Sequence, residues 1–368
     1  MKWKEQILKQ RLTYWILISG LAAVISLAMY SGPASSDSPS GPSPFALQDN
    51  ITGQWLLELT PGADSARITI NRNYGGHGHS SNSFDLPLAS IRGLNQSQAG
   101  SSGSAVKFEV AADAGTFSCE GWFKEGNGSG HFTFAPNQAF ASEMRGLGYD
   151  NLTSEDLFSM AMHGVTRAFI GELKSLGYDH VALDQLIALR IHGVTTSFIR
   201  ELNGMGYEHV PTDELVSMRI HGVNTDFIKG LTTLGYARVP IDQLVSMRIH
   251  GVSLELINTF KDLGYSLPPV DELVSMRIHG ASPEFIKELS GLGYSQVPFD
   301  QLVSMRIHGV SPEFIKEIKT QGYDRVQVDQ LVSMRIHGVS ADYIRKLKDR
   351  GLSNLTIDQL IDMKIHGQ

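Results

Sequence analysis

Cysteine is almost absent from this sequence. Cys119 is the single cysteine among 368 residues, so the chain has neither a disulfide framework nor a cysteine-based zinc site. Because Cys119 alternates with aromatic residues, we expect it to be a small, buried apolar residue. Basic character is also missing. There are 31 Lys and Arg against 38 Asp and Glu, without a basic block, and this balance argues against a nucleic-acid-binding protein.

Motifs typical of enzymes are missing too. The chain has no His-Glu-x-x-His zinc motif, no Gly-x-Ser-x-Gly nucleophile motif and no Gly-rich phosphate loop. His77-Gly78-His79 offers imidazoles, but it lies among Gly, Ser and Asn without a third ligand, and this composition favours a solvated loop. We therefore predict that the protein is not an enzyme and that it needs no metal or cofactor.

A long apolar run lies near the N-terminus. Residues 12–30 form 19 positions without a charge, which as a helix would span ~28 Å, close to the thickness of a bilayer core. Residues 1–11 are basic, whereas residues 31–66 contain no Lys or Arg. This asymmetry predicts a single-pass anchor with a cytoplasmic N-terminus and an exported remainder. The alternative is a cleaved signal peptide, with Ser26-Leu27-Ala28 as the cleavage site.

The middle of the chain changes from linker to strand patterns. Residues 31–49 are rich in Pro, Ser and Gly, which predicts a flexible spacer. Over residues 50–136, apolar residues alternate with polar ones, as in Val106-Lys107-Phe108-Glu109-Val110, and Gly-rich turns separate the runs. This pattern predicts five or six short strands in a small antiparallel sheet, sandwich or partial barrel. An empty barrel interior would offer a site for a small-molecule ligand.

From residue 137 to residue 368 the sequence repeats every 29 residues, which gives eight units. Each unit begins at a residue suited to cap a helix: Asn137, Thr166, Thr195, Asn224, Ser253, Ser282, Ser311 and Ser340. A Gly ends this first helix, and a second helix follows with the sequence Asp-Gln/Glu-Leu-Val-Ser-Met-Arg-Ile-His before another Gly. In the second helix we expect Leu244, Val245, Met247 and Ile249 to supply the apolar content. One unit is too small to fold alone, so the pattern predicts stacked helical repeats like those of an α-solenoid.

Stacked units place equivalent residues in ladders. The first ladder consists of Arg190, Arg219, Arg248, Arg277, Arg306 and Arg335, with Lys364 at its end; the second consists of His192, His221, His250, His279, His308 and His337, with His163 and His366 at its ends. Two interpretations stay open. The ladders bind a partner, an acidic one in the case of the Arg ladder, or they are structural, with each Arg near the first-turn Asp of a neighbouring unit. A metal site is disfavoured because equivalent His residues are a whole repeat apart.

The repeated sequence of Leu302–Glu317 resembles the tandem C-terminal tails of some bacterial membrane proteins. These include antibiotic-sensor-type (BlaR/MecR-like) membrane metallopeptidases and membrane-anchored anti-sigma-like proteins. The segment from Phe117 to Phe140 resembles the region that precedes such tails. The resemblance implies a bacterial envelope protein in a signalling system. It brings no activity, because the zinc motif of the peptidases is missing and the chain has one apolar span.

Together these observations predict a protein of the bacterial inner (cell) membrane with most of its chain outside the cytoplasm, in the periplasm. Its predicted parts are a basic tail (1–11), an anchor (12–30), a linker (31–49), a β domain (50–136) and eight helical repeats (137–368). The predicted function is protein–protein interaction or scaffolding at the membrane, as a sensor or regulatory accessory with a protein partner. The alternative is a carrier whose β domain holds a small molecule while the repeats act as a spacer.

Overall fold

The computed structural model describes residues 50–59, 64–73, 78–94 and 103–367. The predicted anchor, the linker and His77 lie outside these residues. In the part of the chain that is described, no helix is both long and apolar enough to cross a bilayer.

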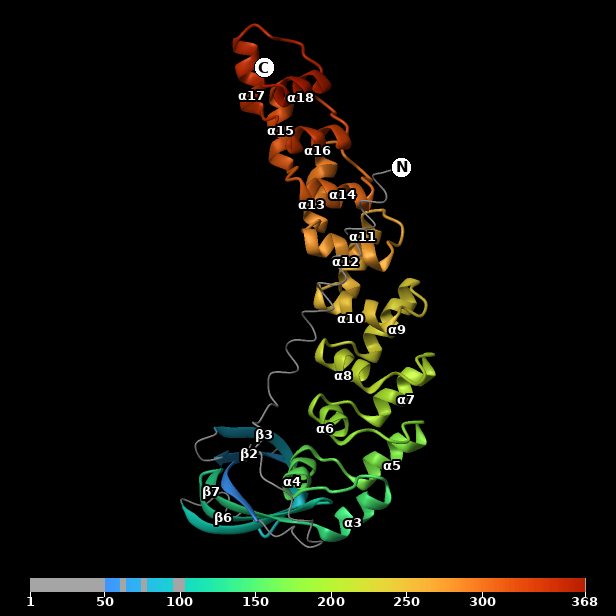
Figure 1. Cartoon of the computed structure of the whole chain (residues 1–368). Helices are drawn as coiled ribbons and strands as arrows, with labels where there is room; N and C mark the ends of the chain where they lie inside the picture. Colours follow the sequence, from blue (N-terminus) through green and yellow to red (C-terminus); the bar gives the residue numbers. More distant parts are fainter. Residues whose placement is uncertain (1–49, 60–63, 74–77, 95–102, 368) are drawn as a thin grey trace, which may run out of the picture. The chain divides into compact units, whose positions relative to one another are not determined.

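The described strands between residues 51 and 136 form one antiparallel sheet that curls into a half-barrel (Figure 1). The strand order is β3-β2-β1-β7-β6-β5-β4. The strands are β1 (Ile51–Leu59), β2 (Ser65–Asn73), β3 (His79–Pro87), β4 (Ile91–Arg92), β5 (Ser104–Ala112), β6 (Gly115–Lys124) and β7 (Asn127–Pro136), and a short 3-10 helix, Leu88–Ser90, precedes β4. The prediction of a small antiparallel β domain is confirmed, as a single curled sheet with seven described strands.

The sequence pattern predicted fewer strands because β3 and β4 leave little trace in it. β3 is polar and has no fully buried residue, and it forms an edge that pairs only with β2 in the described sheet. β4 is two residues long. Alternation of apolar residues detects strands with a buried face, and neither of these edge strands has enough apolar residues to show that pattern.

One face of the sheet carries most of its large side chains. We call it the aromatic face, and its members are Trp55, Phe108, Phe117, Phe123, Phe132 and Phe134, each at most 3% exposed. Cys119 lies on the same face and is fully buried, as predicted, and burial raises the pKa of its thiol to about 12. The thiol therefore stays protonated and serves as packing.

The sheet bends closely around Trp55. The indole N–H lies 3.1 Å from the carbonyl oxygen of His131 and 3.3 Å from that of Glu120, so the buried ring has acceptors on two strands. Beside it, Gly121 and Gly130 face each other across β6 and β7. A Cβ atom added at Gly121 would meet a backbone oxygen at 2.1 Å and the indole of Trp55 at 2.7 Å. Only glycine fits this approach of backbone to backbone and ring.

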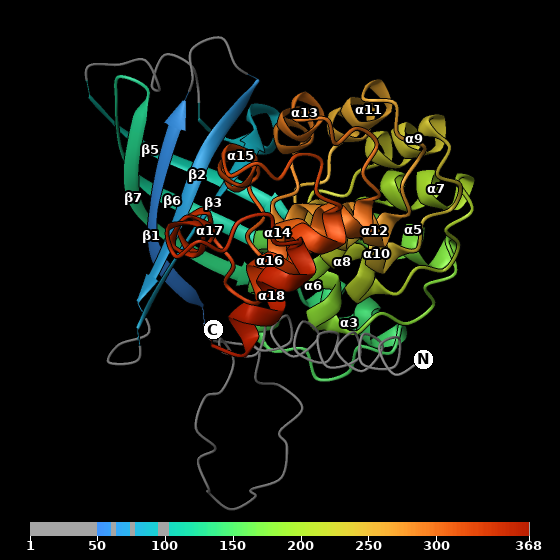
Figure 2. The ribbon, with the colours of Figure 1, turned by 90° about the horizontal axis from the view of Figure 1, so that it is seen from above.

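Sixteen helices, α3 to α18, follow the sheet in the described residues, two in each predicted unit. The first helices are α3 (Gln138–Gly146), α5 (Arg167–Ser175), α7 (Thr196–Gly204), α9 (Thr225–Leu234), α11 (Leu254–Asp262), α13 (Pro283–Gly291), α15 (Pro312–Thr320) and α17 (Ala341–Asp349). The second helices are α4 (Ser154–His163), α6 (Leu183–Ile191), α8 (Thr212–Ile220), α10 (Ile241–Ile249), α12 (Val270–His279), α14 (Phe299–Ile307), α16 (Val328–Ile336) and α18 (Ile357–Ile365). First helices pack on first helices and second helices on second helices, in two rows (Figures 1 and 2).

The predicted caps explain where the first helices begin and end. The side chain of each of the eight predicted cap residues accepts a hydrogen bond from the backbone N–H three residues later, as Ser253 does from Leu256 at 3.2 Å. The Gly after each first helix has a positive φ, between 84° and 109°. The prediction of a 29-residue helical repeat is therefore confirmed in its helix boundaries.

Tyrosine side chains join six of the seven pairs of neighbouring units in the described array. The hydroxyl of Tyr207 donates a hydrogen bond to the carbonyl of Val239 at 2.8 Å, at the entrance to the second helix of the following unit. The same bond spans 32 residues at Tyr149, Tyr178, Tyr207, Tyr236, Tyr294 and Tyr323. Since a repeat of this size cannot bury a core alone, these bonds and the apolar contacts between neighbouring units hold the array together.

Candidate interaction surface

The Arg ladder lies on aromatic rings. Five of its six guanidinium groups stack over the Phe of the first helix in their own unit, with the Cζ atom 5.0–5.3 Å from the ring centroid. The pairs are Arg190 with Phe169, Arg219 with Phe198, Arg248 with Phe227, Arg306 with Phe285, and Arg335 with Phe314. Arg277 has Leu256 at the equivalent position and donates instead to the carbonyl of His250 at 3.2 Å.

The suggested pairing of this ladder with first-turn Asp residues is wrong. Among the described residues, no carboxylate lies within 4 Å of any of the six guanidinium groups. The guanidinium is held on the first helix of its own unit, whereas the Asp residues lie at the other end of the second helix. Five of the six side chains therefore stabilise their units through cation–π contacts.

The side chains of the His ladder do not come together as a metal site. Its members cap or end the second helices, so that neighbouring imidazoles belong to different units. In the described residues, no three His, Cys, Asp or Glu side chains come together in a way that could hold a metal ion. Partial burial lowers the pKa of His250, which favours its neutral form.

A third ladder, of isoleucines, was missed by the sequence analysis. Ile249 was expected to contribute to the core, but its side chain is 53% exposed. Its equivalents behave alike: Ile191, Ile220, Ile278, Ile307, Ile336 and Ile365 are 42–54% exposed. The position of Ile249 around the helix explains this exposure, and the sequence already contains that information. Ile249 follows Leu244 by five positions, about 140° around the helix, so it points away from the buried Leu244 and Met247.

We call the side of each second helix that carries this isoleucine the outward face. In α10 it consists of Asp242, Val245 and Ile249, and the other units have equivalent positions. The acidic members are Asp184, Asp213, Asp242, Asp271, Asp300, Asp329 and Asp358, and in the described residues none has a cationic group within 4 Å. Burial, then the charges of Asp213 and Asp242, raise the pKa of the adjacent Glu214 carboxyl. We call these seven Asp residues the acidic column, and their like charges repel one another.

In the first unit, the outward face is an interface. Its positions are Glu155, Phe158 and Met162 on α4, which packs against β1, β6 and β7 (Figure 1). Phe158 reaches the aromatic face, with ring centroids 5.4–6.1 Å from those of Phe117, Phe132 and Phe134. The guanidinium of Arg72 lies 4.7 Å from the centroid of Phe158 and binds both oxygens of Glu155, at 2.6 and 2.7 Å. Met162 is 5% exposed.

The same contacts bear on the carrier interpretation. That interpretation needs an empty interior in the β domain. The rings of the aromatic face pack against each other, as Trp55 does against Phe108 at 4.9 Å, and Phe158 covers part of that face. This packing favours the scaffold interpretation.

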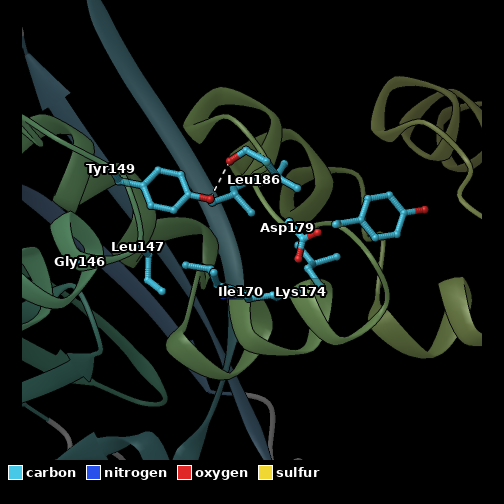
Figure 3. Close-up of a pocket in the computed structure, with 10 residues that line it drawn as sticks. Gly146, Leu147, Tyr149, Ile170, Lys174, Asp179 and Leu186 are labelled. Carbon is cyan, nitrogen blue, oxygen red and sulfur yellow. Dashed lines mark hydrogen bonds between the residues drawn. The ribbon is translucent and has the colours of Figure 1, made fainter.

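Small gaps remain between neighbouring units. One is lined by Leu147, Tyr149, Ile170 and Tyr178 among others, and has a volume of about 140 Å³ (Figure 3). The dashed line in Figure 3 is the bond from the hydroxyl of Tyr149 to the next unit. Five units later, the equivalent gap at Tyr294 has a volume of about 10 Å³. Typical ligand pockets measure roughly 300–1,000 Å³, so these gaps are consequences of stacking rather than ligand sites.

Neither a family model nor a curated protein matches this chain. The resemblance of the repeats to tails of bacterial membrane proteins stays a prediction.

Proposed function

We propose that the helical repeats are a protein-docking scaffold, which the apolar N-terminal run holds at a bacterial membrane. The observation that carries this proposal is the isoleucine ladder. Seven isoleucines at one position of the repeat are each about half exposed, while Met162, at the same position of the first unit, is covered by protein. Rows of exposed apolar side chains on a folded surface mark sites of protein contact.

Comparison among the units strengthens the proposal. An exposed position on the first helix holds four different residue types, mostly basic: Gly171, Arg200, Lys229, Asn258, Lys287, Lys316 and Arg345. The exposed position of Ile249 holds isoleucine in all seven units after the first. Folding does not explain this uniformity, because a half-exposed side chain contributes little to the core. A contact that uses every unit in the same way explains it.

The regulatory role follows from the predicted location. An anchor at residues 12–30 would place the repeats outside the cytoplasm, where they could bind another envelope protein. The absence of catalytic motifs and the array of equivalent surfaces support an accessory that assembles partners rather than one that transforms them.

The proposal is tested by photo-crosslinking in native membranes. A photoreactive amino acid at position 249 of the full chain should give a discrete crosslinked protein, and the same amino acid at exposed Asn258 should not. The crosslink should disappear when Ile220 and Ile278, in the two neighbouring units, are changed to Ser. It should persist when Lys229 and Lys287, on the first helices, are changed to Ser. The same products from positions 249 and 258, or none from 249, would overturn the proposal.

Any truncation used as a control should end after Val165. A chain that ends at Pro136 would lose Phe158 from the aromatic face, so its behaviour would report damage to the sheet.

A further inference from the structure

We infer that the outward face of the units after the first binds an extended protein segment in which apolar side chains alternate with Lys or Arg. This inference rests on the proposed scaffold function and adds the chemistry of the partner. Its starting point is the first unit, where the same face already has an occupant.

The occupant in the first unit combines apolar rings with a cation. Phe158 lies against rings of the sheet, Met162 is buried, and Arg72 of β2 binds Glu155 through its two terminal guanidinium nitrogens. The side chain of Arg72 is 11% exposed, so its charge is largely removed from water and is matched by the carboxylate and the ring of Phe158. A bidentate pair of this kind fixes both position and orientation.

Later units present the same three kinds of group, and among the described residues their isoleucines stay about half exposed. Asp242 stands where Glu155 stands, Val245 replaces Phe158, and Ile249 replaces Met162. A helix places residues seven apart about 20° from each other, so the Asp and the Ile share one side of α10. The face therefore offers a carboxylate and two apolar side chains in line, which complements a partner with apolar residues and a cation.

The Arg ladder is less suited to be the contact. Arg248 lies about 100° from Ile249 around the helix, and its guanidinium is stacked over Phe227. In the docked first unit, Ala161 occupies the Arg position, so that interface forms without a cation there. A basic partner on the acidic column therefore agrees with the observed interface better than an acidic partner on the Arg ladder.

The spacing of the units fits an extended chain. The second helices pack in one row, and helices in contact lie roughly 8–10 Å apart. A segment in the extended polyproline II conformation rises about 3.1 Å per residue with three residues per turn, so every third side chain lies on the same face and advances about 9 Å. A segment of about 20 residues with an apolar side chain at every third position would therefore meet one isoleucine per unit along the row.

The test uses synthetic peptides and the full chain in phosphatidylcholine nanodiscs, with empty nanodiscs as the baseline. The first probe is a fluorescein-labelled peptide of seven Leu-Lys-Ser triplets. The second has Glu in place of Lys, and the third has the composition of the first in scrambled order. Fluorescence anisotropy should show that the Leu-Lys-Ser peptide binds at least tenfold more tightly than either of the others, and that added salt weakens it.

Variants locate the site. Changing both Ile249 and Ile278 to Ser should weaken the Leu-Lys-Ser peptide at least tenfold. Changing Asp242 and Asp271 to Asn should also weaken it and reduce its salt dependence. The matched control is Asp262→Asn on a first helix, which should leave binding unchanged. All five positions are exposed or half-exposed, and circular dichroism should confirm that the variants keep their helices.

Each other outcome is decisive. Equal binding of the Lys and Glu peptides, or tighter binding of the Glu peptide, would overturn the inference, and the latter would point to the Arg ladder. Binding that survives the Ile and Asp substitutions would overturn it as well. If none of the peptides binds while crosslinking at position 249 persists, the inference fails and the scaffold function stands.

Discussion

Phe158→Ala should separate the first repeat from the sheet. The side chain is 7% exposed and contacts three rings of the aromatic face, and a guanidinium covers it. Truncation of a buried Phe to Ala costs ~3–5 kcal/mol. We expect about 4 kcal/mol at this site, because the cation–π contact is lost together with the ring contacts and the curled sheet cannot close over the space.

Hydrogen exchange of the full chain measures this loss locally. A loss of about 4 kcal/mol corresponds to about a thousandfold faster exchange of protected amides in β1, β6 and β7, if these strands open as one unit. Helices of the later units, such as α14, should exchange as before, because repeats couple mainly to their nearest neighbours. The matched control is Val245→Ala, at the same helical position of a later unit, where the side chain is half-buried and about 1 kcal/mol is expected.

Two results would refute this reasoning. If the strands of the Phe158→Ala variant exchange within threefold of the unmodified chain, the ring does not join the unit to the sheet. If α14 loses as much protection as β6, the array unfolds as one cooperative body and the local account is wrong.

Three further predictions concern stability. Gly121→Ala places a Cβ atom 2.1 Å from a backbone oxygen and should cost at least ~2–3 kcal/mol in thermal unfolding, whereas Gly146→Ala, with no atom outside its own helix within 4 Å, should be neutral or stabilise by up to ~1 kcal/mol. Burial raises the pKa of Tyr236 from 10.0 to about 12. The native state thus keeps a proton that the unfolded chain releases, so stability is full below pH ~10 and is lost from pH 10 to 12; urea midpoints of Tyr236→Phe should show a weaker loss. Arg248→Gln should lower the free energy of unfolding, measured by urea titration, by ~0.5–1 kcal/mol more than Arg277→Gln, because Arg277 lacks a ring beneath it; equal losses would contradict the cation–π account.

The helical part of the fold was predictable because its signals are local and repeated. Ser253, followed by a Phe-Ile-type pair and a terminal Gly, specifies cap, buried face and stop within about three turns, and the structure has all three. The edge strand β3 could not be predicted in the same way, because its polar sequence shows no apolar alternation. It forms by pairing with β2. A strand of this kind is defined by its neighbour rather than by its own side chains.

The candidate surface was predictable only in part. The ladders of Arg and His follow from the period alone, but their contacts do not. Whether a guanidinium stacks on Phe227 or pairs with an Asp depends on how the two helices of a unit cross, which the repeat spacing does not state. The exposure of Ile249 could have been inferred from helical phase. An isoleucine at a position opposite Leu244 cannot share its core, and that mismatch was the available signal.

The difference between the first unit and the others gives the strongest argument about the array. Where the sequence has Phe158 and Met162, both side chains are buried, and Phe158 lies against the aromatic face of the sheet. Where it has Val245 and Ile249, the face keeps an apolar residue that its own core does not use. A face that served only solubility would carry polar residues there, as the first helices do. The uniform isoleucine is therefore best explained by an interface that the isolated chain does not complete, and the Arg72–Glu155 pair shows the charge that such an interface matches.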